Sequence, residues 1–421
     1  MREMKDSGIA WIGEIPADWG TRKIKFLHNN DVNSYVDGDW IESPVIVDSG
    51  IRYYTTGNIG DGIFKNQGMG YISEETFIAL HCKYAYSGDL IISRLNAPYG
   101  RSCILPKFVE KCIVAVDNVI LRTDENKRYI CYVTQCSGYQ KSVEDKSSGT
   151  TMKRISRTKL GNVKIPLPSS SEQQEIADFL DAKCGEIDGI LGDIEAQVET
   201  LEAYKRSVIT EAVTKGLRPD AEMKDSGVAW IGEIPADWGI RRFKYIHEKT
   251  NVGESLDKKY WSNDSENCVF YTAGVKPIYT TADFPSWKLT KSNDLLLARN
   301  GTPYVYLPTM NAAYTDHIIR AGIIKSCDRR YARYALQRGI ESVIVDTVSI
   351  STWSVSIWNQ VFLPYPKFTE QQEIADFLDA KCGEIDALIA GKKEQAETLR
   401  AYKKSLIFEY VTGKKEVPRY E

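Results

Sequence analysis

A basic segment between residues 141 and 164 has the residue types in this chain that best suit a chemical role. It holds seven lysines and arginines, at positions 141, 146, 153, 154, 157, 159 and 164, against only Glu144 and Asp145. The run Ser147-Ser-Gly-Thr-Thr151 lies within it. Cations together with small hydroxyl side chains and glycine would suit a loop that lies on phosphate groups. A solvated surface loop has the same composition, and the segment by itself favours neither interpretation.

The motifs of common catalysts are absent from the sequence. It contains no Gly-x-x-x-x-Gly-Lys, no Gly-x-Gly-x-x-Gly after a strand and no Gly-x-Ser-x-Gly. Asn96-Ala-Pro-Tyr99 is close to the Asn-Pro-Pro-Tyr motif of amino-methyltransferases but departs from it at the second residue, and its counterpart is Asn300-Gly-Thr-Pro-Tyr304. We therefore interpret both as turns after a strand. The four histidines and nine cysteines assemble no zinc set, and we expect reduced, mostly buried cysteines.

Two elements that would position these residues occur twice in the chain. Residues 4–28 and 223–247 are identical at 19 of 25 positions, and residues 172–188 and 370–386 at all 17. The segments between them share only scattered pieces, such as Asp89-Leu-Ile-Ile-Ser-Arg94 with Asp294-Leu-Leu-Leu-Ala-Arg299. A repeat of this kind indicates two domains of one fold, with near-identical frames and divergent middles.

The middles are expected to be rich in strands and the shared elements to be helical. Runs of apolar and β-branched residues predict strands at 89–94, 113–121, 294–299 and 318–324, with short helices at 127–137 and 329–338. Two long helices are expected to begin at capping boxes, Ser171 with Gln174 and Thr369 with Gln372, just after prolines 168 and 366. Gly185 and Gly383 could mark a bend or a close helix contact.

The long helices carry heptad-like apolar stripes, which favour pairing with each other. The stripes run through Ile187, Ile194, Leu201 and Val208, and through Ile385, Lys392, Leu399 and Leu406. A continuous helix from 172 to 214 would be ~65 Å long at about 1.5 Å per residue. We therefore expect an antiparallel two-helix spacer. The alternative is that each helix packs only on its own domain.

Charge and hydropathy separate the helices from the rest of the chain. Residues 172–218 carry a net charge of −6 and residues 370–414 carry −2, which leaves +5 elsewhere because the whole chain of 421 residues is at −3. Mildly basic domains suit a polyanionic partner. A hydrophobic content of 43% indicates a globular protein, and the sequence predicts neither a signal peptide nor a membrane span. We expect a cytoplasmic protein.

These features together resemble the specificity subunit of type I restriction–modification systems, over nearly the whole chain. The resemblance rests on three duplicated motifs: Ser-Gly-x-x-Trp-Ile-Gly-x-Ile-Pro-x-x-Trp, the helix entry Glu-Gln-x-x-Ile-x-x-Phe-Leu, and the helix end Leu-x-x-Tyr-Lys-x-Ser-(Val/Leu)-Ile. It implies an α+β fold with two tandem mixed α/β target recognition domains, separated by two long helices that form an antiparallel coiled coil. The domains would be residues 1–170 and 219–368, the spacer helices 171–218 and 369–414, and the tail 415–421.

The resemblance also implies a function without catalysis. Each domain would read one half of a bipartite, asymmetric sequence in double-stranded DNA. The chain would bind no cofactor or metal of its own. It would recruit two methyltransferase subunits that carry S-adenosylmethionine and, in the full complex, two restriction subunits that use ATP and Mg²⁺.

Cations, amides, hydroxyls and aromatic rings in the middles are the predicted DNA contacts. They are Arg94, Arg101, Lys153, Arg154 and Arg157 in the first domain, and Arg299, Asn300, Thr302, Tyr304 and Trp353 in the second. The predicted coiled-coil or partner-contact residues are Ile187, Ile194, Leu201, Tyr204, Ile385, Leu399, Tyr402 and Leu406.

Two other classes of function remain as alternatives. One is a self-contained DNA methyltransferase or nuclease, which would bind S-adenosylmethionine as an isolated chain. The other is a coiled-coil scaffold or a non-productive decoy. For a scaffold, any DNA binding would show little dependence on salt.

Overall fold

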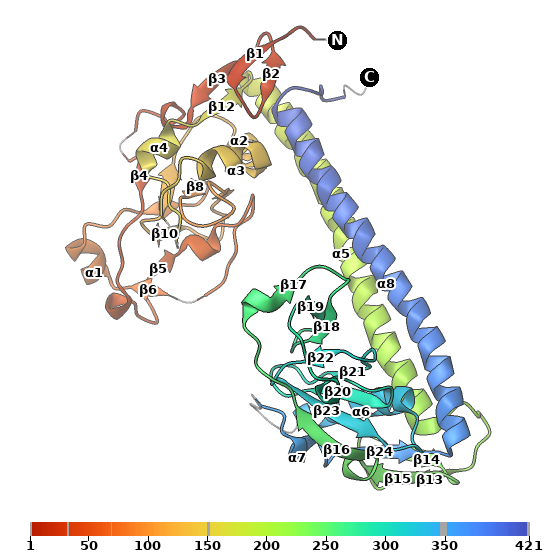
Figure 1. Ribbon diagram of the computed structural model, residues 1–421. Coiled ribbons are helices and arrows are strands. Elements are labelled where there is room, and N and C mark those ends of the chain that lie inside the picture. The colour runs from red at the N-terminus through yellow and green to blue at the C-terminus, as the bar shows by residue number, and fades with distance from the viewer. Residues whose placement is uncertain (1, 32, 69, 150–151, 346–351, 419–421) are drawn as a thin grey trace. The chain divides into compact units, whose positions relative to one another are not determined.

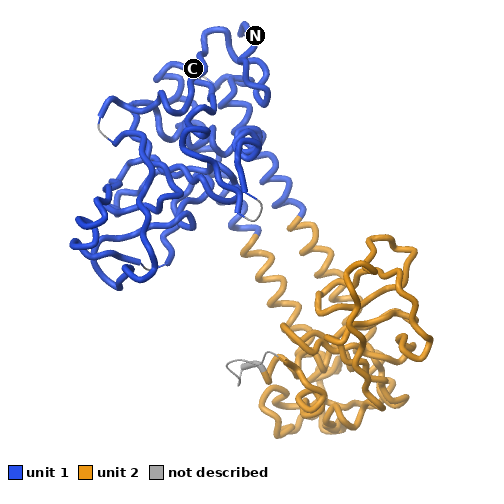
Figure 2. The backbone as a smooth tube through the Cα atoms, turned by 60° about the vertical axis from the view of Figure 1, so that its left-hand side comes forward, with its two compact units in different colours: residues 1–194, 394–421 blue, residues 195–393 orange. Residues whose placement is uncertain are grey.

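The chain folds into two compact units, one of which is assembled from two separate stretches of the sequence (Figure 2). The computed structural model describes residues 2–31, 33–68, 70–149, 152–345 and 352–418. Unit 1 comprises residues 1–194 and 394–421, and unit 2 comprises residues 195–393. Each unit therefore contains one sheet-rich domain together with a part of each long helix.

The two long helices, α5 (Ser170–Lys215) and α8 (Phe368–Val411), pack against each other within each unit (Figure 1). In unit 1, Lys403 Nζ lies 2.6 Å from Asp188 Oδ1, and in unit 2, Lys205 Nζ lies 2.6 Å from Asp386 Oδ2. Residue numbers rise along one helix as they fall along the other, so the pairing is antiparallel, as expected. The glycines at 185 and 383 lie inside these helices, and a Cβ added at either would meet nothing within 4 Å. They mark no close contact.

The domain of unit 1 consists of two four-stranded sheets, a hairpin and short helices. One sheet has the order β4 (Tyr35–Asp37), β11 (Asn118–Leu121), β8 (Leu90–Ser93), β9 (Ser102–Ile104), and the other β6 (Tyr71–Ile72), β5 (Ile51–Tyr54), β10 (Lys111–Val114), β7 (Ala85–Tyr86). The hairpin is β1 (Met4–Ile9) with β2 (Gly13–Pro16), and β3 (Gly20–Lys23) pairs with β12 (Lys164–Leu167). The helices are α1 (Glu74–Ala79), α2 (Lys127–Gln135), α3 (Ser137–Glu144), α4 (Arg157–Gly161) and the 3₁₀ turns η1 (Ile24–Phe26), η2 (Ser43–Val45) and η3 (Thr56–Asn58).

The domain of unit 2 also consists of two four-stranded sheets, a hairpin and short helices, but the parallel strand pair lies at the edge of its second sheet and in the middle of the second sheet of unit 1. Its sheets have the orders β16 (His247–Val252), β23 (Ile318–Ile323), β20 (Asp294–Ala298), β21 (Val305–Tyr306) and β17 (Trp261–Ser262), β19 (Ile278–Thr280), β18 (Cys268–Tyr271), β22 (Ala313–Tyr314). Its hairpin is β13 (Met223–Asp225) with β14 (Glu233–Pro235), and β15 (Gly239–Arg242) pairs with β24 (Phe362–Tyr365). Its helices are α6 (Arg329–Val345), α7 (Val355–Trp358), η4 (Phe243–Tyr245), η5 (Lys258–Tyr260) and η6 (Ser286–Lys288).

Most predicted strands and helices are confirmed, and the differences have local causes. The strand expected at 113–121 is two strands, because Asn118 N donates to Ala115 O (2.8 Å) in a turn that takes the chain from one sheet to the other. The capping box at Ser171 is wrong. The hydroxyl that accepts at the start of α5 belongs to Ser169, from Glu172 N (3.3 Å). The box at Thr369 is also wrong, because α8 has already begun at Phe368.

The duplicated glutamines instead attach each domain to its helix. Gln173 accepts a hydrogen bond from Asn126 N (3.0 Å), ahead of α2, and donates to Pro168 O (3.0 Å). Gln371 repeats this pattern in unit 2, with Asp328 N (2.8 Å) and Pro366 O (2.9 Å). Both glutamines are fully buried, so the bonds satisfy groups that water cannot reach.

One buried tyrosine in each domain attaches that domain to the end of the long helix from the other repeat. Tyr129 OH lies 3.0 Å from Val411 O at the end of α8, and Tyr331 OH lies 3.4 Å from Val213 O near the end of α5. The core of unit 1 accordingly includes Leu406 and Ile407 of α8. Each domain is thus built on the start of its own helix and the end of the other.

Candidate nucleic-acid interface

In unit 1 the turn after a buried strand lies against the basic segment. The turn follows β8 and contains the Asn-Ala-Pro-Tyr sequence at residues 96–99, which confirms the interpretation of this motif as a turn. Ile155 N donates to Arg94 O (3.1 Å), and Leu95 forms a β-bridge with Arg154. Ser156 then caps α4 by accepting from Lys159 N (3.2 Å). These contacts hold the basic segment beside the turn.

Unit 2 repeats this arrangement with different residues. Trp353 N donates to Arg299 O (2.5 Å) after β20, and Asn300 forms a β-bridge with Thr352. Ser354 caps α7 by accepting from Ile357 N (3.4 Å). In each unit the structure therefore brings together the predicted contact residues from the strand end and from the segment before the short helix. We call these two regions the reading edges: residues 94–101 with 152–157, and residues 299–304 with 352–353.

Two of the predicted contacts in unit 1 are buried. Arg94 is 5% exposed; its Nη1 donates to Ile155 O (3.1 Å), and its Nη2 lies 3.1 Å from Asp37 Oδ1. Arg101 is 9% exposed and donates to carbonyls of two loops, including Ile59 O (2.6 Å) and Asn96 O (3.0 Å). Burial lowers the pKa of both guanidinium groups. Both side chains stabilise loops of unit 1, and the prediction that they contact DNA stays untested.

The other three predicted DNA contacts of unit 1 are accessible cations at its reading edge. The side chains of Lys153, Arg154 and Arg157 are 44%, 40% and 41% exposed. Each lies near a carboxylate: Glu144 Oε1 at 3.0 Å, Asp117 Oδ1 at 2.5 Å and Asp37 Oδ2 at 3.5 Å, respectively. A phosphate could replace these partners, because exposed ion pairs contribute little stability.

The reading edge of unit 2 is more polar and less cationic. Thr302 is exposed, and Arg299, Asn300 and Tyr304 are half-buried. Asn300 Nδ2 lies 2.6 Å from His317 Nδ1. Trp353 is 3% exposed, and its indole donates to Gly301 O (2.7 Å), so it packs beneath the turn.

An exposed aromatic site in unit 2 escaped the sequence predictions. Trp287 is 67% exposed, with Lys288 Nζ 5.0 Å from its ring centroid. Trp287, Phe284, Tyr314 and Asn251 line a pocket of about 320 Å³. The signal in the sequence is the neighbouring Trp-Lys pair within a divergent middle.

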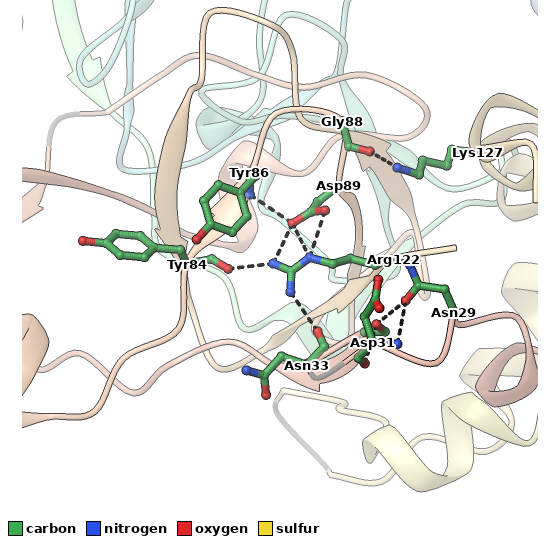
Figure 3. A network of polar contacts seen from close by, with 10 residues as sticks. Asn29, Asp31, Asn33, Tyr84, Tyr86, Gly88, Asp89, Arg122 and Lys127 are labelled. Carbon is green, nitrogen blue, oxygen red and sulfur yellow. Dashed lines mark hydrogen bonds and ion pairs between the residues drawn. The ribbon is translucent and has the colours of Figure 1, made fainter. Parts of the chain in front are cut away.

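An ion pair between half-buried Arg122 and buried Asp89 fixes the strand that carries the reading edge of unit 1. Figure 3 shows the Arg122 guanidinium bonded to the Asp89 carboxylate (3.0 Å), Tyr84 O (2.8 Å) and Asn33 O (3.1 Å). Asp89 also accepts from Tyr86 N (2.9 Å). Asp294 has the equivalent position at the start of β20, accepts from Lys291 N (2.6 Å) and lies 3.7 Å from Arg320 Nε. The Asp of the shared strand motif is therefore structural in both units.

Comparison with known proteins shows similarity to one family. The sequence model of the type I restriction modification DNA specificity domain matches residues 16–200. The putative type I restriction enzyme MjaX specificity subunit of Methanocaldococcus jannaschii is 26% identical over 433 aligned residues, which cover 96% of this chain and 95% of that protein. The MjaVIII specificity subunit of the same organism is 24% identical, over 95% and 93% of the two chains. Residues 16–200 thus match the DNA specificity domain of type I restriction–modification systems, and nearly the whole chain is similar to specificity subunits of type I restriction enzymes.

A solved structure shares the fold of this chain. It is described as the structural basis of complex assembly and conformational transition of the type I R-M system. The match has a TM-score of 0.68 at 14% identity and covers 95% of this chain and 99% of that one. The expected fold, two mixed domains with two long coiled-coil helices, is thereby confirmed. No helix within the described ranges is long and apolar enough to cross a membrane.

The predicted helix contacts fall into three groups by burial. Four are buried in the helix packing: Ile187, Ile194, Ile385 and Leu406, at 6%, 7%, 2% and 5% exposure. Leu201 and Leu399 are half-buried. Tyr204 and Tyr402 are 49% and 55% exposed, so they lie outside the seam and are available to a partner.

Proposed function

We propose that this specificity subunit reads the two halves of a bipartite, asymmetric DNA target with its two units and directs partner subunits to it. DNA target recognition is the function of its family. The proposal that each unit reads one half of the target rests on the repeated reading edge. A similar turn and a capped segment occur in both units, with different side chains. A shared frame with different donors and acceptors suits the reading of two different base sequences.

We also propose that the catalytic groups reside on the partners. Two methyltransferase subunits would bring S-adenosylmethionine, and two restriction subunits would bring ATP and Mg²⁺. The exposed Tyr204 and Tyr402, at equivalent positions of α5 and α8, support two partner sites because each is a large ring left uncovered on a helix surface.

Methylation mapping tests this proposal. The full chain is co-expressed with its methyltransferase subunit, and methylated adenines are mapped across the genome. We expect a bipartite motif with a fixed gap. Asn300→Ala should relax the motif in one half only, since a base contact contributes about 1–3 kcal/mol of discrimination. Methylation with no bipartite motif, or relaxation of both halves together, would contradict the assignment.

Salt dependence separates phosphate contacts from base contacts. Log affinity falls as log salt rises. Replacing Lys153, Arg154 and Arg157 by alanine together should make this fall less steep, by up to about 0.9 in slope per lost phosphate contact. The control is Lys404→Ala, an exposed cation on the α8 part of unit 1. An unchanged slope in the triple variant would exclude phosphate binding by the basic segment.

A further inference from the structure

The ends of the two long helices are near copies that differ at three positions, and at two of them an aromatic ring replaces a small side chain. Residues 208–214 of α5 read VITEAVT and residues 406–412 of α8 read LIFEYVT. Thr210 therefore corresponds to Phe408, and Ala212 to Tyr410. Each of these ends packs on the domain of the unit to which it belongs, beside an identical Asp-Phe-Leu-Asp sequence.

In unit 1 the larger side chain fills the space beside that sequence. The ring of Tyr410 lies 4.5 Å, centroid to centroid, from the ring of Phe179. Tyr410 is 6% exposed and Phe179 is half-buried as a result. This end of unit 1 thus supplies its own aromatic ring.

In unit 2 the corresponding space is open. Phe377, the counterpart of Phe179, is 41% exposed, because Ala212 has no ring to cover it. A pocket of about 690 Å³ lies here, with apolar walls from Phe377, Tyr204, Val208 and Ala212. The linker between α5 and β13 is fully described and does not close it: Leu217 also lines the pocket and remains 41% exposed.

We infer that this pocket receives an aromatic side chain from a methyltransferase partner. The two sites at which methyltransferase subunits bind are then not equivalent. The inference rests on the proposed function. The occupant is aromatic because the equivalent place in unit 1 holds a tyrosine ring against the same phenylalanine. Exposed aromatic walls suit edge or face packing of a further ring, and pockets of this kind typically hold the anchor residues of an interface. Glu211 and Lys215 at the pocket provide the polar rim that such interfaces have.

The variant Ala212→Tyr tests this by giving unit 2 the side chain of unit 1. Native mass spectrometry and titration calorimetry of the full chain with purified methyltransferase subunit measure how many partners bind and with what stepwise affinity. We expect two partners on the unaltered chain. In the variant, one of the two affinities should fall by about tenfold or more and the other should change by less than about twofold. The control is Ala196→Tyr, which adds the same ring to an exposed position of α5 outside the pocket.

A second variant keeps the test decisive if the added tyrosine impairs folding. Phe377→Ala removes a wall of the pocket without adding bulk and should weaken the same one of the two sites. If both affinities are unchanged in a folded variant, or if self-association of the chain is lost instead, the inference is wrong. If the unaltered chain binds no methyltransferase at all, it is the proposed function that fails.

Discussion

At the scale of single residues, chemically similar cations have different roles because their burial differs. Arg101 spans two loops of unit 1 with five hydrogen bonds to backbone carbonyls: Thr56, Ile59, Leu95, Asn96 and Pro98. Lys153 projects to solvent and has one carboxylate partner. The sequence alone could not separate them, since both are cations in divergent segments.

This contrast predicts opposite effects of two alanine substitutions. Arg101→Ala should destabilise unit 1 by about 3–5 kcal/mol, because several buried carbonyls lose a charged donor. Lys153→Ala should leave stability nearly unchanged, because the side chain projects to solvent, and still weaken DNA binding. Urea unfolding and salt-dependent DNA titration measure the two effects. Equal stability losses would refute the distinction.

The cysteines give a second residue-scale prediction. Burial raises the pKa of the Cys184 thiol to about 11 and that of Cys136 to about 12, so neither forms a thiolate near neutral pH. Cys268 is the one cysteine of the nine that is not buried. Iodoacetamide at pH 8 should alkylate Cys268 first and the others only after unfolding, as read by peptide mass spectrometry. Early labelling of Cys184 would show that the helix packing opens.

At the scale of elements, the long helices contain glycines without a packing reason. Gly185 and Gly383 have open space at the Cβ position, and helix propensity favours alanine there by about 1 kcal/mol. Gly185→Ala and Gly383→Ala should therefore each raise the free energy of unfolding by that amount. Thermal unfolding followed by circular dichroism measures this.

The matched control lies just beyond the end of α8. Gly413 has φ +70°, and a Cβ there would lie 2.4 Å from Pro16 Cδ, so Gly413→Ala should destabilise. A lower Tm for Gly185→Ala would contradict the open space that the structure shows at this position.

At the scale of the whole molecule, unit 1 depends on both ends of the sequence, whereas unit 2 is a single internal stretch. Residues 394–421 complete unit 1 by contributing Leu406, Ile407 and Val411 to its core. Deleting residues 394–421 should therefore loosen unit 1 and leave unit 2 intact. Hydrogen–deuterium exchange should show faster exchange in α2 and in residues 173–194, with little change in α6.

Leu406→Ala is a milder version of the same test. It removes a 5% exposed side chain from unit 1 and should cost about 2–5 kcal/mol there. Faster exchange in unit 2 rather than unit 1, in either variant, would contradict the division of the chain.

The duplication, the long helices, their antiparallel pairing and the main buried strands were all predictable from the sequence. These features depend on local periodicity and on exact repetition, which a linear sequence displays directly. The turn at Asn96 was also predictable, because the corresponding sequence at Asn300 differs from it, which argued against a catalytic motif.

Only the tertiary structure decided which residues are removed from water. Arg94 and Arg101 are buried by loops distant in sequence, Ser169 rather than Ser171 accepts at the start of α5, and Phe377 is exposed while Phe179 is covered. In each case the neighbour that matters comes from elsewhere in the chain or from a helix register that the residue itself does not specify. Desolvation and hydrogen bonding depend on those neighbours, and so near-identical sequences in the two units acquire different surfaces.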